Sequence, residues 1–377
     1  MESKPHYNYH DVLWAPAKAL SAKQIATMTL FLLLSLVVYN LFTYSALAVD
    51  YQPLSSAFSV YGLLPFDYHT FESSLARSVY YSGIGVSVFV IMLGMFAIAA
   101  FNIELIRGNR FMSIRQVLRF TRQRMSQIFL SELSIVLFVG FVIFLLFLFG
   151  LITRIPYLGD WLYLLFFIFP GFIITIFVIF ILFVCVASIL LLPAVSAAER
   201  QGETFTAILE TFSIIIRQPI RWLGYTLYSL AAAKVSMFVF AYFAYRAVMF
   251  LVWSVSLGGG EKIVTLTQSG LTLLPHNSAL VSSVFSLFPG VTFSFSVSEF
   301  ARRWAETPAA YGMAVVLFII FASVLGYGLA IIAAAQARGY AALRKIKDNH
   351  LIGDEQSLFF VDEHVNPEIV TSPIKTE

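Results

Sequence analysis

The chain has 377 residues, of which 59% are hydrophobic and 12% are charged, and its formal net charge is +3. Soluble domains contain about 45–50% apolar and about 25% charged residues, so this composition excludes an ordinary soluble domain. The single cysteine, Cys185, excludes a disulfide framework within the chain and argues against a cysteine-based metal site. We expect it to be a small apolar packing residue.

The apolar residues gather in six runs, each long enough for the roughly 20 helical residues that cross the hydrocarbon core of a bilayer. An α-helix satisfies its own backbone hydrogen bonds in lipid, whereas a lone strand or loop does not. The runs therefore predict an all-α integral membrane protein with six transmembrane helices. These runs are Ala26–Val49, Val79–Leu105, Phe129–Leu151, Trp161–Pro193, Trp222–Val255 and Gly312–Ala335.

The lysine and arginine residues predict the orientation. If the N-terminus is inside, the inner segments hold 17 of them and the outer segments hold 5. The positive-inside rule then places both termini in the cytoplasm. We expect a transmembrane domain over residues 1–347, with outer loops at 50–78 and 256–311, and an acidic cytoplasmic tail over 348–377. Ala46-Leu47-Ala48 resembles a signal cleavage site, but the run before it exceeds the roughly 7–15 residues of a signal peptide.

A local pattern recurs where the runs reach the predicted inner side. Three runs end with a basic or amide residue followed by glycine, and two of these glycines, Gly108 and Gly202, lie 94 residues apart. Phe111 and Phe205 keep the same offset. We predict three hairpin repeats, each entered and left from the same side, with chance similarity between apolar helices as the alternative. The three pairs are Arg107-Gly108, Gln201-Gly202 and Arg338-Gly339.

Amphipathic segments precede the third and fifth runs. Their apolar residues recur every three or four positions, which predicts helices lying in the inner membrane interface. The first apolar stripe is Phe111, Ile114, Leu118 and Met125, and the second is Phe205, Ile208, Leu209, Phe212 and Ile216. Beside the first stripe, Arg115, Arg119 and Arg122 form a basic stripe that we expect to contact anionic lipid. Residues 11–20 are a weaker first copy, because Pro16 interrupts them.

Three ionisable residues, Lys234, Arg246 and Glu132, form a candidate intramembrane polar site. Lys234 lies about twelve residues into its run, so roughly 18 Å deep at 1.5 Å per residue. A cation near the bilayer centre costs at least about 2.5 kcal/mol, so we expect Lys234 to face the protein interior, water or an acid. Lys234 then either lines a path for an anion, a lipid headgroup or a proton, or forms a buried ion pair. Arg246 is expected to be an interfacial anchor, and Glu132, like Glu104, to pair with an interfacial arginine.

No cofactor, metal or catalytic site is predicted. All six histidines lie outside the runs, which argues against the deep axial ligands of a membrane haem. His6 and His10 have the spacing of helical metal ligands, but Pro5 and the absence of acidic partners for the pair argue against a metal site. The charge asymmetry concerns topology, so no nucleic-acid partner is expected.

Three segments leave alternatives open. Small residues recur every fourth position at Ala322, Gly326, Ala330 and Ala334, and they predict either internal helix packing or a subunit interface. The Val- and Thr-rich stretch 262–268 is a candidate short strand. The apolar tetrapeptide 358–361 either docks on the membrane domain or a partner, or is disordered with the rest of the tail.

One stretch resembles a known group of proteins. It comprises Pro193-Ala194, Glu199, Gly202, Phe205 and Ala207-Ile208, followed by an aromatic-rich run, and it is joined by the ending Ala341-Ala342-Leu343-Arg344. This pattern resembles poorly characterised bacterial membrane proteins that include the membrane domain attached to some glycerophosphodiester phosphodiesterases. The resemblance implies a helical domain of a bacterial inner membrane. Nothing in the chain matches the acid and histidine pattern of the phosphodiesterase domain, so no activity and no functional residue carries over.

The leading hypothesis is a non-enzymatic scaffold or accessory subunit of an envelope complex in the bacterial inner membrane. Its expected partners are membrane lipids and either another protein or a second copy of the chain. The alternative is a permease for a lipid or small anion, with Lys234 in a polar path. An enzyme acting on lipid is disfavoured, because no catalytic constellation is visible in the sequence.

Overall fold

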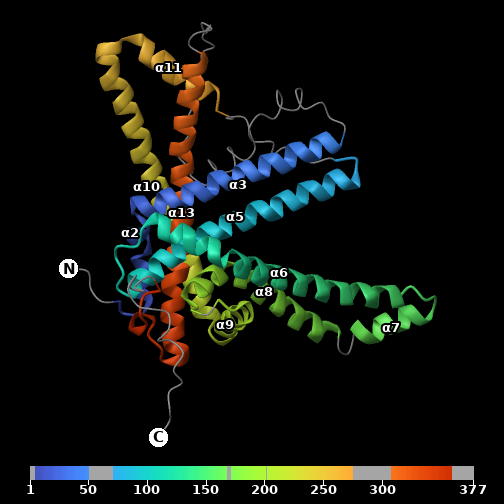
Figure 1. Ribbon diagram of the computed structural model, residues 1–377. Coiled ribbons are helices and arrows are strands. Elements are labelled where there is room, and N and C mark those ends of the chain that lie inside the picture. The colour runs from blue at the N-terminus through green and yellow to red at the C-terminus, as the bar shows by residue number, and fades with distance from the viewer. Residues whose placement is uncertain (1–4, 51–70, 168–170, 201, 275–306, 359–377) are drawn as a thin grey trace, which may run out of the picture.

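The computed structural model describes residues 5–50, 71–167, 171–200, 202–274 and 307–358 (Figure 1). Within these ranges the regular structure is helical, and no strand is found. The helices are α1 (Tyr9–Leu13), α2 (Ala15–Ala19), α3 (Ala22–Val49), α5 (Ser74–Ile106), α6 (Ile114–Ile152), α7 (Leu158–Phe166), α8 (Phe172–Ala198), α9 (Thr204–Arg217), α10 (Pro219–Gly259), α11 (Glu261–Thr272), α13 (Thr307–Asp348) and the 3₁₀ turn η3 (Ile352–Asp354).

Six of these helices, α3, α5, α6, α8, α10 and α13, are long and apolar enough to cross a membrane. They correspond to the six predicted runs, so the all-α fold class and the six candidate spans are confirmed. The shortest of them, α8, has 27 residues. At 1.5 Å per residue it is about 40 Å long, which exceeds the roughly 30 Å of a hydrocarbon core. The chain is therefore built as a multi-pass membrane protein.

The six long helices form three hairpins that meet at one end (Figure 1). The hairpins are α3–α5, α6–α8 with α7 at its tip, and α10–α13 with α11 at its tip. We call their meeting point the hub. It contains α1, α2, α9, η3, the starts of α3, α6 and α10, and the ends of α5, α8 and α13. Both described ends of the chain, residues 5 and 358, also lie at the hub.

Local sequence signals explain where the hub helices begin and end. Ser113 caps α6 through a reciprocal capping box with Gln116, the arrangement that satisfies two free N–H groups of a first turn. Gly108 and Gly202 follow α5 and α8 with φ of +91° and +77°, a conformation that glycine adopts without strain. The third glycine, Gly339, lies inside the continuous helix α13. The threefold hairpin repeat therefore stays a prediction.

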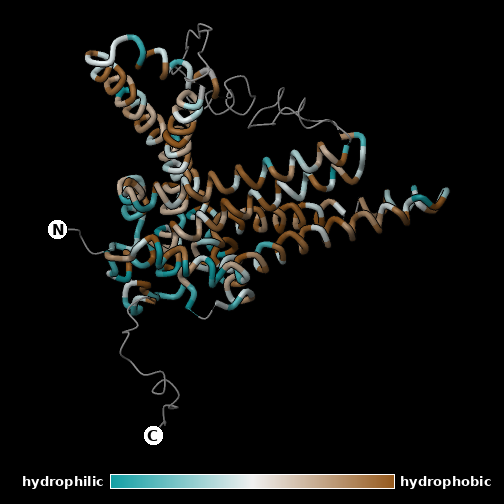
Figure 2. Tube along the Cα trace, turned by 45° about the horizontal axis from the view of Figure 1, so that its top comes forward, coloured by the Kyte–Doolittle hydropathy of each residue, from teal (hydrophilic) through white to brown (hydrophobic). Residues whose placement is uncertain are grey.

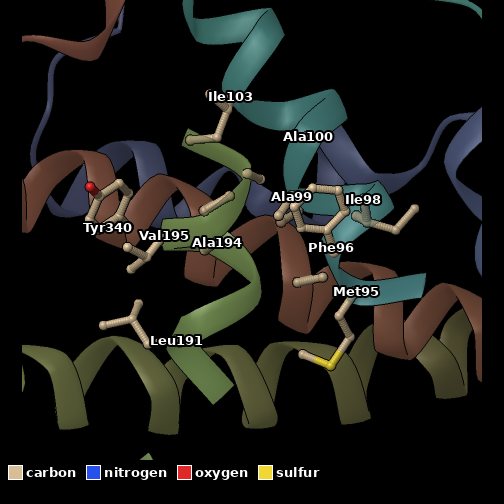
Figure 3. Close-up of a cluster of buried hydrophobic side chains, with 14 of the residues drawn as sticks. Met95, Phe96, Ile98, Ala99, Ala100, Ile103, Leu191, Ala194, Val195 and Tyr340 are labelled. Atoms are coloured by element: carbon tan, nitrogen blue, oxygen red, sulfur yellow. The ribbon is translucent and has the colours of Figure 1, made fainter. Parts of the chain in front are cut away.

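Apolar side chains from α5, α8 and α13 fill the centre of the hub. Figure 3 shows part of this core, with Tyr340 of α13 beside Val195 of α8 and with Phe96 of α5 beside Ala99. These four residues, and also Ile103 and Leu191, are buried. Alanines between these residues let the helices approach closely. The same sequence stretches carry the polar side chains described below, so the core and the polar site are interleaved.

The small-residue ladder on α13 packs inside the molecule. Ala322, Gly326, Ala330 and Ala334 are all buried. A Cβ atom placed on Gly326 would lie 2.6 Å from the Thr29 hydroxyl oxygen and 3.0 Å from the Thr29 backbone nitrogen of α3. Only a glycine permits this approach, so of the two alternatives the structure supports internal packing at this ladder.

Away from the hub the hairpins diverge (Figure 1), and their arms are apolar (Figure 2). In the most apolar stretch of α10, none of the residues is buried, and in that of α6 only 6% are buried. In the corresponding stretch of α5, 67% are buried. The arms point in different directions (Figure 1), whereas transmembrane helices tilt on average by about 20° from the bilayer normal. Crossing of one flat bilayer by all six helices therefore requires the arms to turn about the hub.

Local structure differs from the sequence-based expectation in two places. The prediction of a strand at 262–268 is wrong, because these residues lie in helix α11. Packing of α11 against α13 and α10 overrides the β propensity of its valine and threonines, and Gly270 allows close contact with Met313. The run Trp161–Pro193 is divided between α7 and α8, and α8 begins just after Gly171.

Two matched glycine substitutions on α13 test the α3–α13 contact. We expect Gly326→Ala to destabilise the protein by about 1–3 kcal/mol, the usual cost of overpacking. Gly312→Ala is the control, because a Cβ at Gly312 meets nothing within 4 Å and alanine favours a helix. Thermal unfolding of the detergent-solubilised protein measures both. Equal midpoints for the two variants would contradict the packing described here.

Candidate functional site

A buried ion pair lies at the hub end of α5. Glu104 and Arg107 are one turn apart, their side chains are 2% and 0% exposed, and Arg107 Nη1 lies 3.1 Å from Glu104 Oε1. Arg107 Nη2 also donates a hydrogen bond to the carbonyl of Ala198 at the end of α8, at 2.8 Å. A buried charge is costly unless it is paired and hydrogen-bonded, so these contacts are conditions for the fold. The predicted pairing of Glu104 with an arginine is confirmed.

Residues 351–358, which we call the strap, close over this pair. The Glu355 carboxylate of the strap contacts three guanidinium groups from three other parts of the chain. Its Oε2 atom contacts Arg107 Nη2 and lies 3.8 Å from Arg200 Nε, and its Oε1 atom lies 3.3 Å from Arg344 Nη1. His350 Nδ1 is 3.7 Å from the same Oε1 atom. The acidic tail thus begins with a residue that is part of the hub.

Both halves of the strap have further anchors. In the first half, Ile352 is fully buried, and the Gly353 backbone N–H donates to the Tyr7 hydroxyl at 2.8 Å. Burial raises the pKa of Tyr7, which keeps its phenol protonated. In the second half, the Ser357 hydroxyl and the Leu358 backbone N–H donate to Glu104. Leu358 also packs partly against the core, whereas residues 359–361 of the apolar tetrapeptide lie outside the described residues.

Uncharged polar residues tie the hairpins together beneath the strap. Asn102 of α5 donates to Gln24 Oε1 of α3 at 3.1 Å and accepts from Arg338 Nε of α13 at 3.3 Å. Gln336 Nε2 of α13 donates to the Thr226 hydroxyl of α10 at 3.0 Å. In the sequence, such a cluster is indicated by an amide side chain within an apolar run. The predicted polar site contains ionisable residues only, so it does not include these amides.

The α6–α8 hairpin joins the hub through Glu199. Its carboxylate accepts from Gln127 Nε2 of α6 at 3.3 Å and lies 3.9 Å from Arg124 Nη1. It also accepts from the backbone N–H groups of Gly202 and Glu203 at 2.7 and 2.9 Å, which satisfies free donors at the start of α9. One carboxylate therefore connects α6, α8 and α9.

The structure does not assemble the predicted intramembrane polar site. Lys234 is exposed on α10 and has no hydrogen bond or ion pair to any described residue, so it does not face an acid or the protein interior. Arg246 contacts Tyr242 on its own helix, with Nε 3.2 Å from the hydroxyl. Glu132 lies on α6, and its Oε1 atom is buried without a partner among the described residues. Glu132 therefore lacks the expected arginine.

The basic stripe lies on the outside of the hub. Arg115, Arg119 and Arg122 are exposed on the first turns of α6 and form no ion pair with the described part of the chain. Phe111 nearby is 91% exposed, whereas Val117 and Phe120 are buried against the hub. This segment thus has one face packed on the protein and two outward faces, one apolar and one basic.

Comparisons with protein-family models, with curated proteins and with solved structures give no match. Within the described ranges, no three His, Cys, Asp or Glu side chains are grouped so that they could hold a metal ion. Functional inference therefore depends on the geometry of the hub.

Substitution of Arg107 tests the buried pair. We expect Arg107→Met to destabilise the protein by about 3–5 kcal/mol, because Glu104 is left as an unpaired buried charge. The double variant Glu104→Gln/Arg107→Met should recover part of this loss. Arg115→Met is the control, since Arg115 is exposed on α6. Denaturation of the solubilised protein measures the differences, and a neutral Arg107→Met would show that the pair does not stabilise the hub.

Proposed function

We propose that this chain is a non-enzymatic polytopic protein of the bacterial inner membrane that acts as a scaffold or accessory subunit of an envelope complex. The observation that carries the proposal is the hub. Its buried charged and amide groups link all three hairpins through contacts with one another and with backbone groups. Such a platform keeps the membrane arms joined at one end, which is what a scaffold requires.

The use of the hub carboxylates supports a structural role for them. Glu104 accepts hydrogen bonds from Arg107, Asn109, Ser357 and the Leu358 backbone. Glu199 accepts from Gln127 and from two backbone N–H groups. A catalytic acid or base needs a lone pair or proton directed at a substrate. These two carboxylates instead use their lone pairs to accept hydrogen bonds from other groups of the protein.

The charge distribution supports an orientation with the hub in the cytoplasm. The described parts of the four segments that hold 17 of the lysine and arginine residues meet at the hub, and both described chain ends lie there. The exposed residues Arg115, Arg119 and Arg122 then face the anionic surface of the inner leaflet. The amphipathic segments α9 and the start of α6 are proposed to lie in that interface.

The uncovered arms support partners in the membrane. The outward sides of α6 and α10 carry large apolar side chains, including Phe141, Phe147 and Phe250, each more than half exposed. Lipid acyl chains cover such surfaces, and so does a second polytopic protein or a second copy of this chain. The arms therefore offer attachment surfaces, while the hub keeps them joined.

One observation favours the alternative of a permease for a lipid or small anion. Lys234 is exposed on an apolar helix without a partner among the described residues, and a cation at this depth needs water or an anion beside it.

Lys234→Met separates the two proposals. For a scaffold we expect unchanged assembly and a stability change within about 0.5 kcal/mol, as is usual for exposed sites. For a permease, the variant loses anion or lipid flux in proteoliposomes while it still folds. Flux that depends on Lys234 would overturn the scaffold assignment.

Native mass spectrometry after gentle extraction tests the scaffold proposal directly. We expect a partner protein or a second copy bound at fixed stoichiometry. We expect the Arg107→Met variant to lose this partner, because the hub is destabilised. Arg115→Met is the matched control and should retain it. A protein that is monomeric under every gentle condition, with no change on substitution, would argue against a scaffold.

The basic stripe gives a lipid prediction. Replacing Arg115, Arg119 and Arg122 by glutamine should weaken retention of phosphatidylglycerol, with about 1 kcal/mol lost per arginine near the surface. The control replaces Arg154 and Lys262, which lie at the far ends of two hairpins. Lipid bound per protein, measured after delipidation and titration, should fall only in the first variant. Equal retention in both would place the stripe away from lipid.

A further inference from the structure

Three arginines converge on one carboxylate at the edge of the hub. Arg107 ends α5, Arg200 lies between α8 and α9, and Arg344 lies near the end of α13. All three guanidinium groups lie within 4 Å of Glu355 oxygen atoms. Because these arginines come from three separate parts of the chain, the fold itself creates the cluster. The strap contributes the Glu355 carboxylate at its centre and the Gln356 carbonyl, which accepts a hydrogen bond from Arg200.

The charges in this cluster do not balance. Three guanidinium groups face two carboxylates, Glu104 and Glu355, so one positive charge remains. Arg107 Nε is a buried donor that has no hydrogen-bond partner in the described part of the chain. A phosphate group in place of Glu355 carries up to two negative charges and three acceptor oxygens, and it would neutralise the cluster. Guanidinium groups bind phosphate through paired hydrogen bonds, which suits this set of donors.

The cluster is also open to solvent on one side. The side chain of Arg107 is 0% exposed, that of Arg344 is 24% exposed and that of Arg200 is 47% exposed, with Glu355 at 13%. The site thus has a deep end and an accessible end, as a binding site for a small anion requires.

The strap is held mainly by polar contacts. Ile352 is its only fully buried side chain among residues 351–358. A segment with few buried apolar contacts opens at low cost in free energy. Loss of the Glu355 contacts removes the ionic anchors of the strap and leaves the Ile352 side chain and a few hydrogen bonds to hold it.

We propose that Arg107, Arg200 and Arg344 form a binding site for a phosphate-bearing anion, and that Glu355 of the strap occupies this site until the anion displaces it. Binding of the anion and release of the strap are then one event. The phosphate group is the element recognised, and it is supplied either by a free phosphate or by a lipid headgroup. This site does not depend on the scaffold proposal.

Hydrogen exchange on the full-length protein in detergent tests the proposal. The backbone N–H groups of Gly353 and Leu358 report on the strap, because they donate to Tyr7 and Glu104. Inorganic phosphate and a short-chain phosphatidic acid are added separately, with sodium chloride at matched ionic strength as the control. We expect one or both phosphate compounds to speed exchange in peptides covering 352–358, while chloride alone does not. Release by inorganic phosphate identifies a free anion, and release by phosphatidic acid alone identifies a lipid headgroup.

Two variants make the test specific. Glu355→Gln removes the competing charge, so it should bind the effective compound at least roughly tenfold more tightly than the native chain. Arg200→Gln should weaken binding, whereas Arg217→Gln, an exposed arginine on α9, should not. If neither compound releases the strap, or if Glu355→Gln binds no more tightly, the cluster is a closed set of ion pairs and the proposal is wrong.

Discussion

The desolvation of Glu104 and Arg107 is the constraint on which the rest of the hub depends. Two charged side chains at most 2% exposed must satisfy one another, and the remaining donors and acceptors must find partners nearby. The Ala198 carbonyl, Asn109 and the strap provide those partners. The end of α8 and the start of the tail are therefore held where the end of α5 needs them. Ionic and amide contacts, rather than apolar burial alone, set the relative positions of the hairpins here.

Hub and arms follow different physical rules. In the arms, apolar side chains face outward, and lipid satisfies them as well as another helix does, so nothing forces the hairpins together there. In the hub, amide and charged groups are paired with one another and with backbone and hydroxyl groups of the fold. Asn102 illustrates the difference, because its side chain bonds to Gln24 and Arg338 and so ties α3, α5 and α13 at a single point. Attachment at one end and divergent apolar arms at the other follow from this division.

The proposed anion site would connect the architecture to a means of control. The contacts of the strap reach α5, the link between α8 and α9, and α13, which belong to three different hairpins. An anion that takes the place of Glu355 would leave the Asn102 and Glu199 clusters intact while it frees the tail. A scaffold with such a site can report the presence of a phosphate group to whatever binds its C-terminal segment, without dissolving its membrane domain.

The six candidate spans were determined by the sequence itself, because about 20 apolar residues in lipid have only the helix available. The positions of Gly108 and Gly202 also marked the ends of α5 and α8 correctly. Sequence reasoning placed Glu104 near an arginine but did not name Arg107. It did not single out Asn102, an amide within an apolar run, or Gln24, an amide just before one. It grouped Lys234 and Glu132, yet in the fold Lys234 is exposed and Glu132 Oε1 is buried without a partner among the described residues. Only the fold decides which distant side chains meet, because these contacts depend on how the three hairpins cross. Asn102 and Arg338, for example, form a hydrogen bond although they are 236 residues apart.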